Sequence, residues 1–285
     1  MNLVSPGGLV VAIPIHGAAQ LVERCVESVV ASMAINPPFT LELRDDASPD
    51  AEIGALLDRY TQTPGVRIVR QPENLGFTRT ANAAMDAAWR DDVILLNSDT
   101  VVANDWVARL RNAAHSAPDI ASVTPFSNNA TIASFPEFLI DNALAPGQSV
   151  AQLDRAFSSV NSGQTIDIPT AVGFCMYIRR DAIDRVGLFD AVSYPRGYGE
   201  ENDWCMRALA AGLRNVLATD VYVFHKGGSS FGESRRELMQ AGDRVLSAAH
   251  PHYGKLVRAF IDADPPRPFR ERALAWLNIH QASAR

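Results

Sequence analysis

The sequence has few cysteines and no long hydrophobic run. Its 285 residues include three cysteines, Cys25, Cys175 and Cys205. Because this number is odd and the cysteines lie far apart, neither a disulfide framework nor a cysteine zinc site is expected, and a reducing compartment fits. No apolar run approaches the ~20 residues that cross a bilayer, and the N-terminal residues lack the features of a signal peptide. We therefore predict a soluble cytoplasmic protein, which could still touch the inner face of the membrane.

Positive charge is also scarce. The chain carries 26 Lys and Arg against 32 Asp and Glu, which gives a formal net charge of -6. We expect no nucleic-acid partner, because such proteins need a basic excess to offset phosphate charge, although a local site can still hold a single nucleotide. The hydrophobic content of 47% is ordinary for a globular protein, and 285 residues suit one large domain or two coupled halves.

The N-terminal part of the chain alternates between apolar strands and amphipathic helices. Strands are expected at 9–13, 40–43, 66–69 and 93–96, and helices at 21–33, 53–60 and 81–89. Pro14 should stop the first strand, and Ser48 with Pro49 should begin the second helix. Short alternations of this kind predict a parallel, doubly wound sheet with right-handed crossovers.

The rest of the chain is less regular. Segment 125–165 is rich in Pro, Ser, Asn and Gly, and such long segments are often functional rather than regular. The apolar stripe Leu256, Val257, Phe260 and Ile261 should pack on the domain or form a dimer contact. Strands are expected at 120–123, 171–178, 216–218 and 221–224, and helices at 106–114, at 181–186 ending at Gly187, from 198–204 to Gly212, and in a tail from about 233.

Acidic residues follow two of the predicted strands. Asp45 and Asp46 come after the second strand, and Asp99 comes after the fourth. In an open α/β sheet, ligands bind beyond the carboxyl ends of the strands. Asp46 could therefore accept hydrogen bonds from a nucleobase or ribose, and Asp99 could hold a phosphate-bound metal ion. Both could instead shape a turn or cap the helix that follows.

A third acidic group, Glu200, Glu201 and Asp203, falls in the first turn of a predicted helix. The helix dipole favours each negative charge there by about 0.3–1 kcal/mol, so capping is one explanation. Mutual repulsion should nevertheless raise the pKa of at least one carboxyl group, which suits a general base.

Two weaker signals lie at other element ends. His225 follows a predicted strand and precedes a Gly/Ser loop, so it is either structural or joins a carboxylate around a divalent ion. The turn Asn74-Leu75-Gly76 is either an ordinary turn or a place where the backbone approaches a nucleotide, because glycine has no side chain.

Seven segments occur in a recognisable order. They are Val11-Ala12-Ile13-Pro14-Ile15-His16, Arg44-Asp45-Asp46-Ala47-Ser48-Pro49-Asp50, Asn74-Leu75-Gly76-Phe77 with Asn82, Leu95-Leu96-Asn97-Ser98-Asp99-Thr100, Gly173-Phe174-Cys175-Met176, Gly199-Glu200-Glu201-Asn202-Asp203, and Val223-Phe224-His225-Lys226. Over about residues 9–232, this order resembles family 2 glycosyltransferases of the GT-A fold, which are inverting, metal-dependent, nucleotide-sugar enzymes. It is especially similar to bacterial transferases that build rhamnose-containing or other cell-surface polysaccharides.

The resemblance implies an α/β fold of the GT-A type. A doubly wound, mostly parallel sheet would be flanked by helices and accompanied by a small second sheet and a helical C-terminal tail. Residues 1–232 would form the transferase domain, with a nucleotide-binding half at about 1–103 and an acceptor and catalytic half at 104–232. Residues 233–285 would pack on it as a helical extension. A homodimer and fusion to further domains stay open.

The resemblance also implies roles for individual residues. Glu201 would be the general base, and Asp99 and His225 would bind Mn²⁺ or Mg²⁺. The pocket for donor and acceptor would include Gly173, Phe174, Glu200, Asp203 and Trp204. The nucleotide sugar would contact Pro14, Ile15, His16, Asp46, Asn74, Gly76, Arg79, Asn97, Ser98 and Asp99.

Asn97 departs from the family pattern, because it stands where the first aspartate of an Asp-x-Asp motif is expected. An amide is a poorer ligand than a carboxylate for a hard cation, so Asn97 should face the ribose or the water shell of the metal. A histidine ligand tilts the expectation towards Mn²⁺.

The sequence therefore predicts an inverting transferase that moves a hexosyl or rhamnosyl group from a UDP- or dTDP-linked donor to a saccharide or lipid-linked acceptor. Two alternatives stay open. A sugar-nucleotide nucleotidyltransferase shares this type of half-sheet, but residues 14–19 lack the Lys or Arg expected in its triphosphate loop. A non-catalytic glycan-binding module would share the fold, but the presence of Asp99, Glu201 and His225 argues against it.

Overall fold

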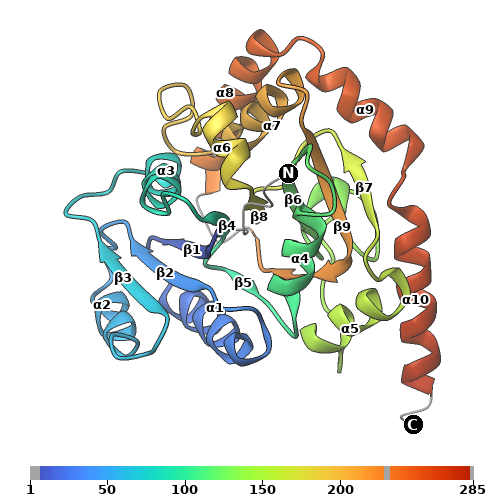
Figure 1. Cartoon of the computed structure of the whole chain (residues 1–285), viewed down its shortest axis with the longest axis horizontal. Coiled ribbons are helices and arrows are strands. Elements are labelled where there is room, and N and C mark those ends of the chain that lie inside the picture. The colour runs from blue at the N-terminus through green and yellow to red at the C-terminus, as the bar shows by residue number, and fades with distance from the viewer. Residues whose placement is uncertain (1–6, 228–231, 283–285) are drawn as a thin grey trace, which may run out of the picture.

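A computed structural model describes residues 7–227 and 232–282 of the chain (Figure 1). Its main sheet has the strand order β3-β2-β1-β4-β8-β6-β9-β7. Strands β1 to β4 are mutually parallel, as are β6 and β9, whereas β8 runs antiparallel to both β4 and β6, and β7 antiparallel to β9. The strand bounds are β1 Leu9–Ile15, β2 Thr40–Asp45, β3 Val66–Arg70, β4 Asp92–Leu96, β6 Ile120–Phe126, β7 Thr165–Ile168, β8 Cys175–Ile178 and β9 Arg214–Tyr222.

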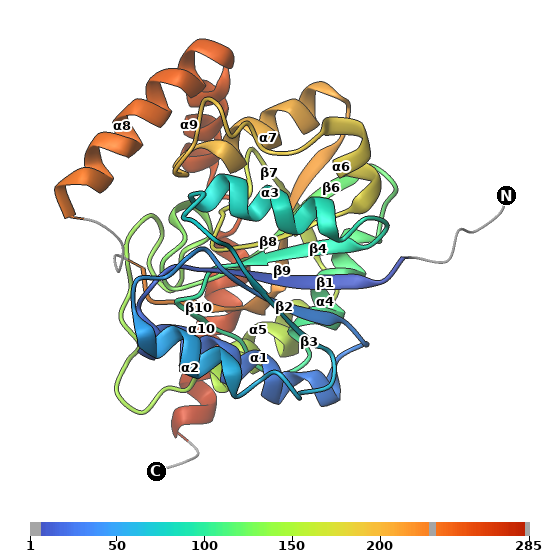
Figure 2. The same cartoon turned by 90° about the vertical axis from the view of Figure 1, so that its left-hand side faces the viewer.

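Alternating side chains bury both faces of this sheet. On β1, Val11 and Ile13 join one hydrophobic cluster, while Val10 and Ala12 join another on the opposite face. Figure 2 shows the two helical layers that cover these faces. One layer contains α1 Ala19–Ser32, α2 Ala51–Asp58, α4 Trp106–Ala114 and α5 Val150–Asn161, and the other contains α3 Phe77–Ala87, α6 Arg180–Val186 and α7 Glu200–Ala210. The predicted doubly wound, mostly parallel architecture is confirmed.

A second, antiparallel sheet joins distant parts of the chain. It consists of β5 Thr100–Val101 and β10 Phe224–His225, with Thr100 opposite His225. Short 3-10 helices also occur at Met33–Ile35 and Thr131–Ala133. The small sheet therefore brings the residues after β4 next to the residues after β9, although these two segments lie far apart in the sequence.

The C-terminal residues form three helices, α8 Gly232–Ala249, α9 Tyr253–Ala263 and α10 Arg267–Ala282. Helix α10 packs against α5 and buries Ala273 and Leu277. In α9, Phe260 packs partly buried against the core, whereas Leu256 remains 42% exposed, so the predicted apolar stripe is only partly covered. Over 7–227 and 232–282, no helix has both the length and the apolar character that a membrane span requires.

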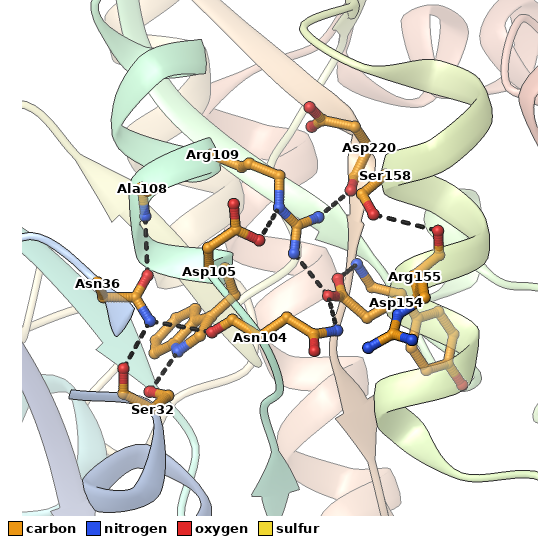
Figure 3. A network of polar contacts seen from close by, with 12 residues as sticks. Ser32, Asn36, Asn104, Asp105, Ala108, Arg109, Asp154, Arg155, Ser158 and Asp220 are labelled. Atoms are coloured by element: carbon orange, nitrogen blue, oxygen red, sulfur yellow. Dashed lines mark hydrogen bonds and ion pairs between the residues drawn. The ribbon is translucent and has the colours of Figure 1, made fainter. Parts of the chain in front are cut away.

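A buried polar network ties α4 and α5 to β9 (Figure 3). The guanidinium of Arg109 donates hydrogen bonds to Asp105 at 2.9 Å, to Asp154 at 2.5 Å and to the main-chain oxygen of Asp220. Asp154 also accepts the main-chain N–H of Tyr222 at 3.0 Å. Burial raises the pKa of Asp154, although the charge of Arg109 opposes this shift. Each buried charge therefore depends on its partner.

Two local predictions in the first half were wrong. Strand β1 continues through Pro14, because its pairing with β4 ends at Ala12 and the missing N–H of proline breaks no ladder bond there. Helix α2 begins at Ala51, after Asp50, and Ser48 does not cap it. The Ser48 hydroxyl instead accepts the N–H of Gly17 at 3.0 Å.

Three predictions in the second half also need correction. Segment 125–165 contains the helix α5, whose first turn is capped by the Ser149 hydroxyl accepting the N–H of Gln152 at 3.1 Å. The strand expected at 171–178 is shorter, because β8 begins at Cys175. The two strands expected at 216–218 and 221–224 are largely one strand, β9, followed by β10. The expected ends of α6 at Gly187 and of α7 at Gly212 are confirmed, and both glycines have positive φ.

Candidate functional site

The first group of predicted site residues lies at the ends of β1 and β2. The carboxylate of Asp46 accepts two backbone N–H groups, from Leu75 at 2.8 Å and Gly76 at 3.0 Å. The His16 ring nitrogen Nδ1 lies 3.1 Å from the main-chain oxygen of Asp46, and the Asn74 amide nitrogen lies 3.1 Å from Nε2. Asp46 therefore holds the turn at 74–76 beside an exposed histidine.

The same turn connects the N-terminal half to the segment before α7. Gly76 has φ 81°, and a Cβ atom there would lie 2.6 Å from the main-chain oxygen of Pro195. Nearby, the side chain of Asn82 on α3 exchanges two hydrogen bonds with the main chain of Phe189, at 2.9 and 3.0 Å. Glycine is required at 76 because both the backbone conformation and this contact exclude a side chain.

The second group joins Asp99 to His225. Asp99 Oδ1 lies 3.3 Å from His225 Nε2, and both side chains are mostly buried. The other ring nitrogen, Nδ1, lies 2.8 Å from the carbonyl oxygen of Asn129. A carbonyl only accepts, so Nδ1 carries a proton and donates it to Asn129, and this bond orients the ring with Nε2 facing the Asp99 carboxylate.

Two further residues fix the position of His225. The ring of Phe174 stacks on the imidazole, with centroids 5.1 Å apart and planes 18° apart. The side chain of Asn128 accepts the N–H of His225 at 2.8 Å and donates to its main-chain oxygen at 2.9 Å. Asn128 was not predicted, because no local pattern marks a contact with a residue so far along the chain.

The donor set of Asp99 and His225 fits a divalent cation. Adjacent ligands of an octahedral ion with bonds of about 2.1 Å lie about 3 Å apart, which matches the observed spacing of the two side chains. Within the described ranges, no three or more His, Cys, Asp or Glu side chains come together as a metal site, so other ligands would complete the shell. Arg24 and Lys226 line the same small hollow as Asp99 and add positive charge there.

Asn97 and Ser98 lie in the turn that leads to Asp99. The Asn97 N–H donates to the main-chain oxygen of Phe174 at 2.8 Å, and its own main-chain oxygen accepts the Thr100 hydroxyl at 2.8 Å. These bonds fix the backbone of the turn against the start of β8. The side chain of Asn97 is half-buried beside them.

The third group lies in the first turn of α7. Glu201 is half-buried, and its Cδ atom would lie 3.6 Å from a Cβ atom placed on Gly173. Glu200 is buried, and its Oε2 atom has no hydrogen-bond partner among the residues that the structure describes. Burial raises the pKa of both carboxyl groups, and the charge of Glu201 raises that of Glu200 further. Glu201 therefore ionises first, while Glu200 keeps its proton to higher pH.

The second and third groups meet at Gly173 and Phe174. Phe174 stacks on His225, while its neighbour Gly173 lies beside Glu201. Consecutive Cα atoms are about 3.8 Å apart, so this dipeptide keeps the Asp99–His225 pair close to an ionisable carboxylate. The sequence predicted these residues but could not predict their spacing.

The other predicted binding residues differ in how far they are buried. Ile15 and Trp204 are buried in the core, and Trp204 donates its indole N–H to the main-chain oxygen of Gly187 at 2.8 Å. Asp203 is mostly buried and pairs with Arg207 at 2.8 Å. Arg79 is exposed on α3, and Pro14 is half-buried in β1.

Solved structures with the same fold include three of glycosyltransferases. A structure of GalNAc-T7 with UDP, GalNAc and Mn²⁺ has a TM-score of 0.62 at 17% identity, covering 95% of this chain and 55% of that one. The mannosyltransferase PcManGT from Pyrobaculum calidifontis, in complex with GDP-Man and Mn²⁺, has a TM-score of 0.61 at 17% identity, covering 99% and 80%. TarS 1-349 from S. aureus, in complex with UDP-GlcNAc, has a TM-score of 0.57 at 15% identity, covering 89% and 71%.

This chain thus spans little more than half the length of the GalNAc-T7 chain that it matches. Comparison with curated proteins gives no match. The family model described as Glycosyl transferase family 2 matches residues 10–187, which is more than half of the chain. That region includes Asp46 and Asp99, the parallel strands β2, β3 and β4, and all of β1 except Leu9. The chain therefore belongs to glycosyl transferase family 2.

Proposed function

We propose that the protein is an inverting, metal-dependent glycosyltransferase that moves a sugar from a nucleotide diphosphate donor to a saccharide or lipid-linked acceptor. The observation that carries the proposal is the adjacency of two groups with different chemistry. A carboxylate and an imidazole lie 3.3 Å apart, and Phe174 and Gly173 connect them to a second, ionisable carboxylate. The first pair suits a diphosphate with its cation, and the second carboxylate suits a hydroxyl nucleophile.

The donor would bind along the ends of β1, β2 and β4. His16, Asn74 and the turn held by Asp46 would contact the nucleoside. Asp99 and His225 would hold Mn²⁺ or Mg²⁺, which when bound neutralises charge on the diphosphate as it leaves. Arg24 and Lys226, which line the same hollow as Asp99, would add positive charge beside it.

Glu201 would act on the acceptor. Its ionised carboxylate takes the proton of the acceptor hydroxyl while that oxygen attacks the anomeric carbon, from the face opposite the diphosphate. The bond from the anomeric carbon to the diphosphate oxygen breaks in the same displacement, and the nucleoside diphosphate leaves. A single displacement inverts the anomeric configuration. Glu200, which keeps its proton longer, would leave Glu201 as the sole negative charge of the pair.

For the substrate class, we propose a UDP- or dTDP-linked hexose or rhamnose donor and a role in cell-surface polysaccharide synthesis. The order of sequence segments supports the polysaccharide class. Two of the three similar structures contain UDP or UDP-GlcNAc and one contains GDP-Man, so uridine nucleotides are the first to test.

The proposal is tested first by binding. UDP, dTDP and GDP are each added with Mn²⁺, with Mg²⁺ or with a chelator, and the melting temperature is measured. A ligand at one hundred times its Kd stabilises the folded protein by about 2.7 kcal/mol. In a chain of this size, each kcal/mol of stabilisation raises the melting temperature by about 2–4 °C. No metal-dependent shift with any nucleotide would contradict the proposed donor site.

The second test is chemistry. UDP-glucose, UDP-GlcNAc, UDP-GalNAc, dTDP-rhamnose and GDP-mannose are incubated with the protein and Mn²⁺, and release of the nucleoside diphosphate is followed. Slow hydrolysis of one donor, with water as the acceptor, is expected. A nucleotidyltransferase would instead require added pyrophosphate and would convert the donor to a nucleoside triphosphate and sugar 1-phosphate, and a glycan-binding module would release nothing.

A further inference from the structure

The approach to α7 has an unusual backbone. Gly197, Tyr198 and Gly199 precede Glu200 and have φ values of 91°, 69° and 131°. A side chain at φ values of this kind costs about 1–2 kcal/mol, and Tyr198 carries one. A Cβ atom on Gly199 would lie 2.7 Å from the Tyr194 ring, so glycine is required there. Such a segment holds its shape only where its surroundings impose it.

Helix α8 supplies part of these surroundings. Its residue Gly242 is buried against Tyr198, and a Cβ atom on Gly242 would lie 1.9 Å from the Tyr198 main-chain oxygen. The same atom would lie 3.9 Å from the Tyr194 ring. Helix α8 therefore lies directly on the backbone of the segment that leads into α7, at a distance that only glycine permits.

The residues between α8 and α9 contact the first turn of α7 itself. His250 Nε2 lies 2.8 Å from Asp203 Oδ1, and Asp203 also accepts Arg207 Nε at 2.8 Å. Tyr253, at the start of α9, is half-buried, and burial together with the charge of Glu201 raises the pKa of its phenol. The C-terminal extension thus contacts α7 at Asp203 and the segment before α7 at Tyr198.

We propose that Gly242 and His250 are positioning residues, through which the C-terminal extension holds segment 197–199 and the first turn of α7 so that Glu201 faces the acceptor. This inference rests on the proposed function, in which Glu201 is the general base. The donor residues come from the ends of β1, β2, β4 and β10, so donor binding should not depend on this support. Loss of the support should lower turnover and leave nucleotide affinity unchanged.

The test compares two glycines of the extension. In Gly242→Ala, the new methyl group meets the Tyr198 oxygen, whereas in Gly254→Ala on α9 it meets nothing within 4 Å. Displacement of a catalytic group by about 1 Å can cost 10²-fold, so Gly242→Ala should lower kcat for hydrolysis of the best donor by about 10–100-fold. The Kd of the nucleoside diphosphate with Mn²⁺ should not change. Gly254→Ala should match wild type in both measurements.

A second pair of variants tests the histidine contact. His250→Ala removes the hydrogen bond to Asp203, and His250→Gln keeps a nitrogen donor within reach of it. Loss of one hydrogen bond corresponds to about a two- to tenfold decrease in kcat. The glutamine variant should recover most of that loss without any change in KM for the donor. Equal kcat values in both variants would overturn the assignment of His250.

Amide hydrogen exchange tests the support of α7 by α8 without a measurement of turnover. Exchange at 197–203 should be faster in Gly242→Ala than in wild type and in Gly254→Ala, with β1, β2 and β4 unaffected. Unchanged exchange there would overturn the inference even if the enzyme is active. If wild type hydrolyses none of the donors, the proposed function fails, while the exchange result still decides whether α8 supports α7. A parallel loss of melting temperature, nucleotide affinity and kcat in Gly242→Ala would show a general role in folding and would also overturn it.

Discussion

The replacement Glu201→Gln tests the proposed chemistry most directly. Glutamine has the size of glutamate, and it can keep the place beside Gly173 and the contact of 3.4 Å with the Asn202 side chain. What it cannot do is accept a proton. A general base contributes about 10²–10⁴-fold to a rate, so turnover should fall by that factor, equivalent to about 2.7–5.5 kcal/mol in the barrier.

The adjacent replacement Glu200→Gln is the matched control. Glu200 keeps its proton to higher pH than Glu201, so glutamine at 200 changes neither the size nor the charge of the protonated group. This variant should keep most of the wild-type turnover. Both variants should bind the nucleoside diphosphate as wild type does, because its proposed ligands lie on other elements.

The pH dependence adds a second readout. Burial raises the pKa of Glu201 above its usual value of 4.5, so kcat/KM should increase as the pH rises through that higher pKa. The assay measures nucleoside diphosphate release with the donor well below its KM, from about pH 5 to about pH 9, with Kd from calorimetry. Near-normal turnover of Glu201→Gln would remove this residue from its role, and a larger loss in Glu200→Gln would move the base to position 200.

Four further predictions concern binding and stability. Asp99→Ala should abolish the metal-dependent part of nucleotide affinity, and unchanged affinity in calorimetry with Mn²⁺ present would show that the metal site is misassigned. Asn128→Ala removes the two bonds that fix His225, so Mn²⁺ affinity measured with nucleotide should fall by about 10–100-fold, and equal affinity would refute this support. Asp154→Ala leaves a buried guanidinium without its main partner (Figure 3), so urea unfolding should show a loss of about 3 kcal/mol, and a loss below about 1 kcal/mol would mean that the network is dispensable. Glu200 binds its proton more tightly in the folded protein than in the unfolded chain, so its contribution to stability falls as the pH rises above its usual pKa of 4.5. The melting temperature of Glu200→Gln should therefore rise relative to that of wild type towards about pH 8. A relative decrease would contradict the direction of the pKa shift.

The first half of the fold could be predicted because its pattern is local. Strands β1 and β4 are buried on both faces, and the helices between the strands repeat their apolar residues at helical spacing. The second half mixes these patterns. Strand β9 looked like two strands because Thr219 and Asp220 interrupt it, yet Thr219 donates to the Gln164 oxygen at 2.7 Å and Asp220 accepts the Gly163 N–H at 2.8 Å. Polar residues with partners can stay within a buried strand.

The sequence could indicate candidate site residues but not the contacts that these residues make. Asp46, Asp99, Glu201 and His225 stand at element ends, where a sheet of this type binds its ligands. The sequence could not show that Asp46 spends both carboxylate oxygens on the backbone of 75–76, because that contact depends on the register of β2 and β3. Helix α5 was missed although Ser149 and Gln152 have the spacing of a capping pair, because the surrounding composition favours irregular structure.

The two halves of the site also differ in what holds them. Apart from His225 on β10, the residues assigned to the donor follow strands of the main sheet, whose ladders and two hydrophobic clusters fix them from both faces. Glu201 instead follows three residues with positive φ, and its first helical turn contacts an extension that lies beyond the matched family region. A displacement reaction needs both ends of the substrate aligned, since misplacing either reacting group raises the barrier. We therefore expect changes in the C-terminal extension to alter turnover and acceptor use, while the choice of nucleotide is determined by residues on the main sheet.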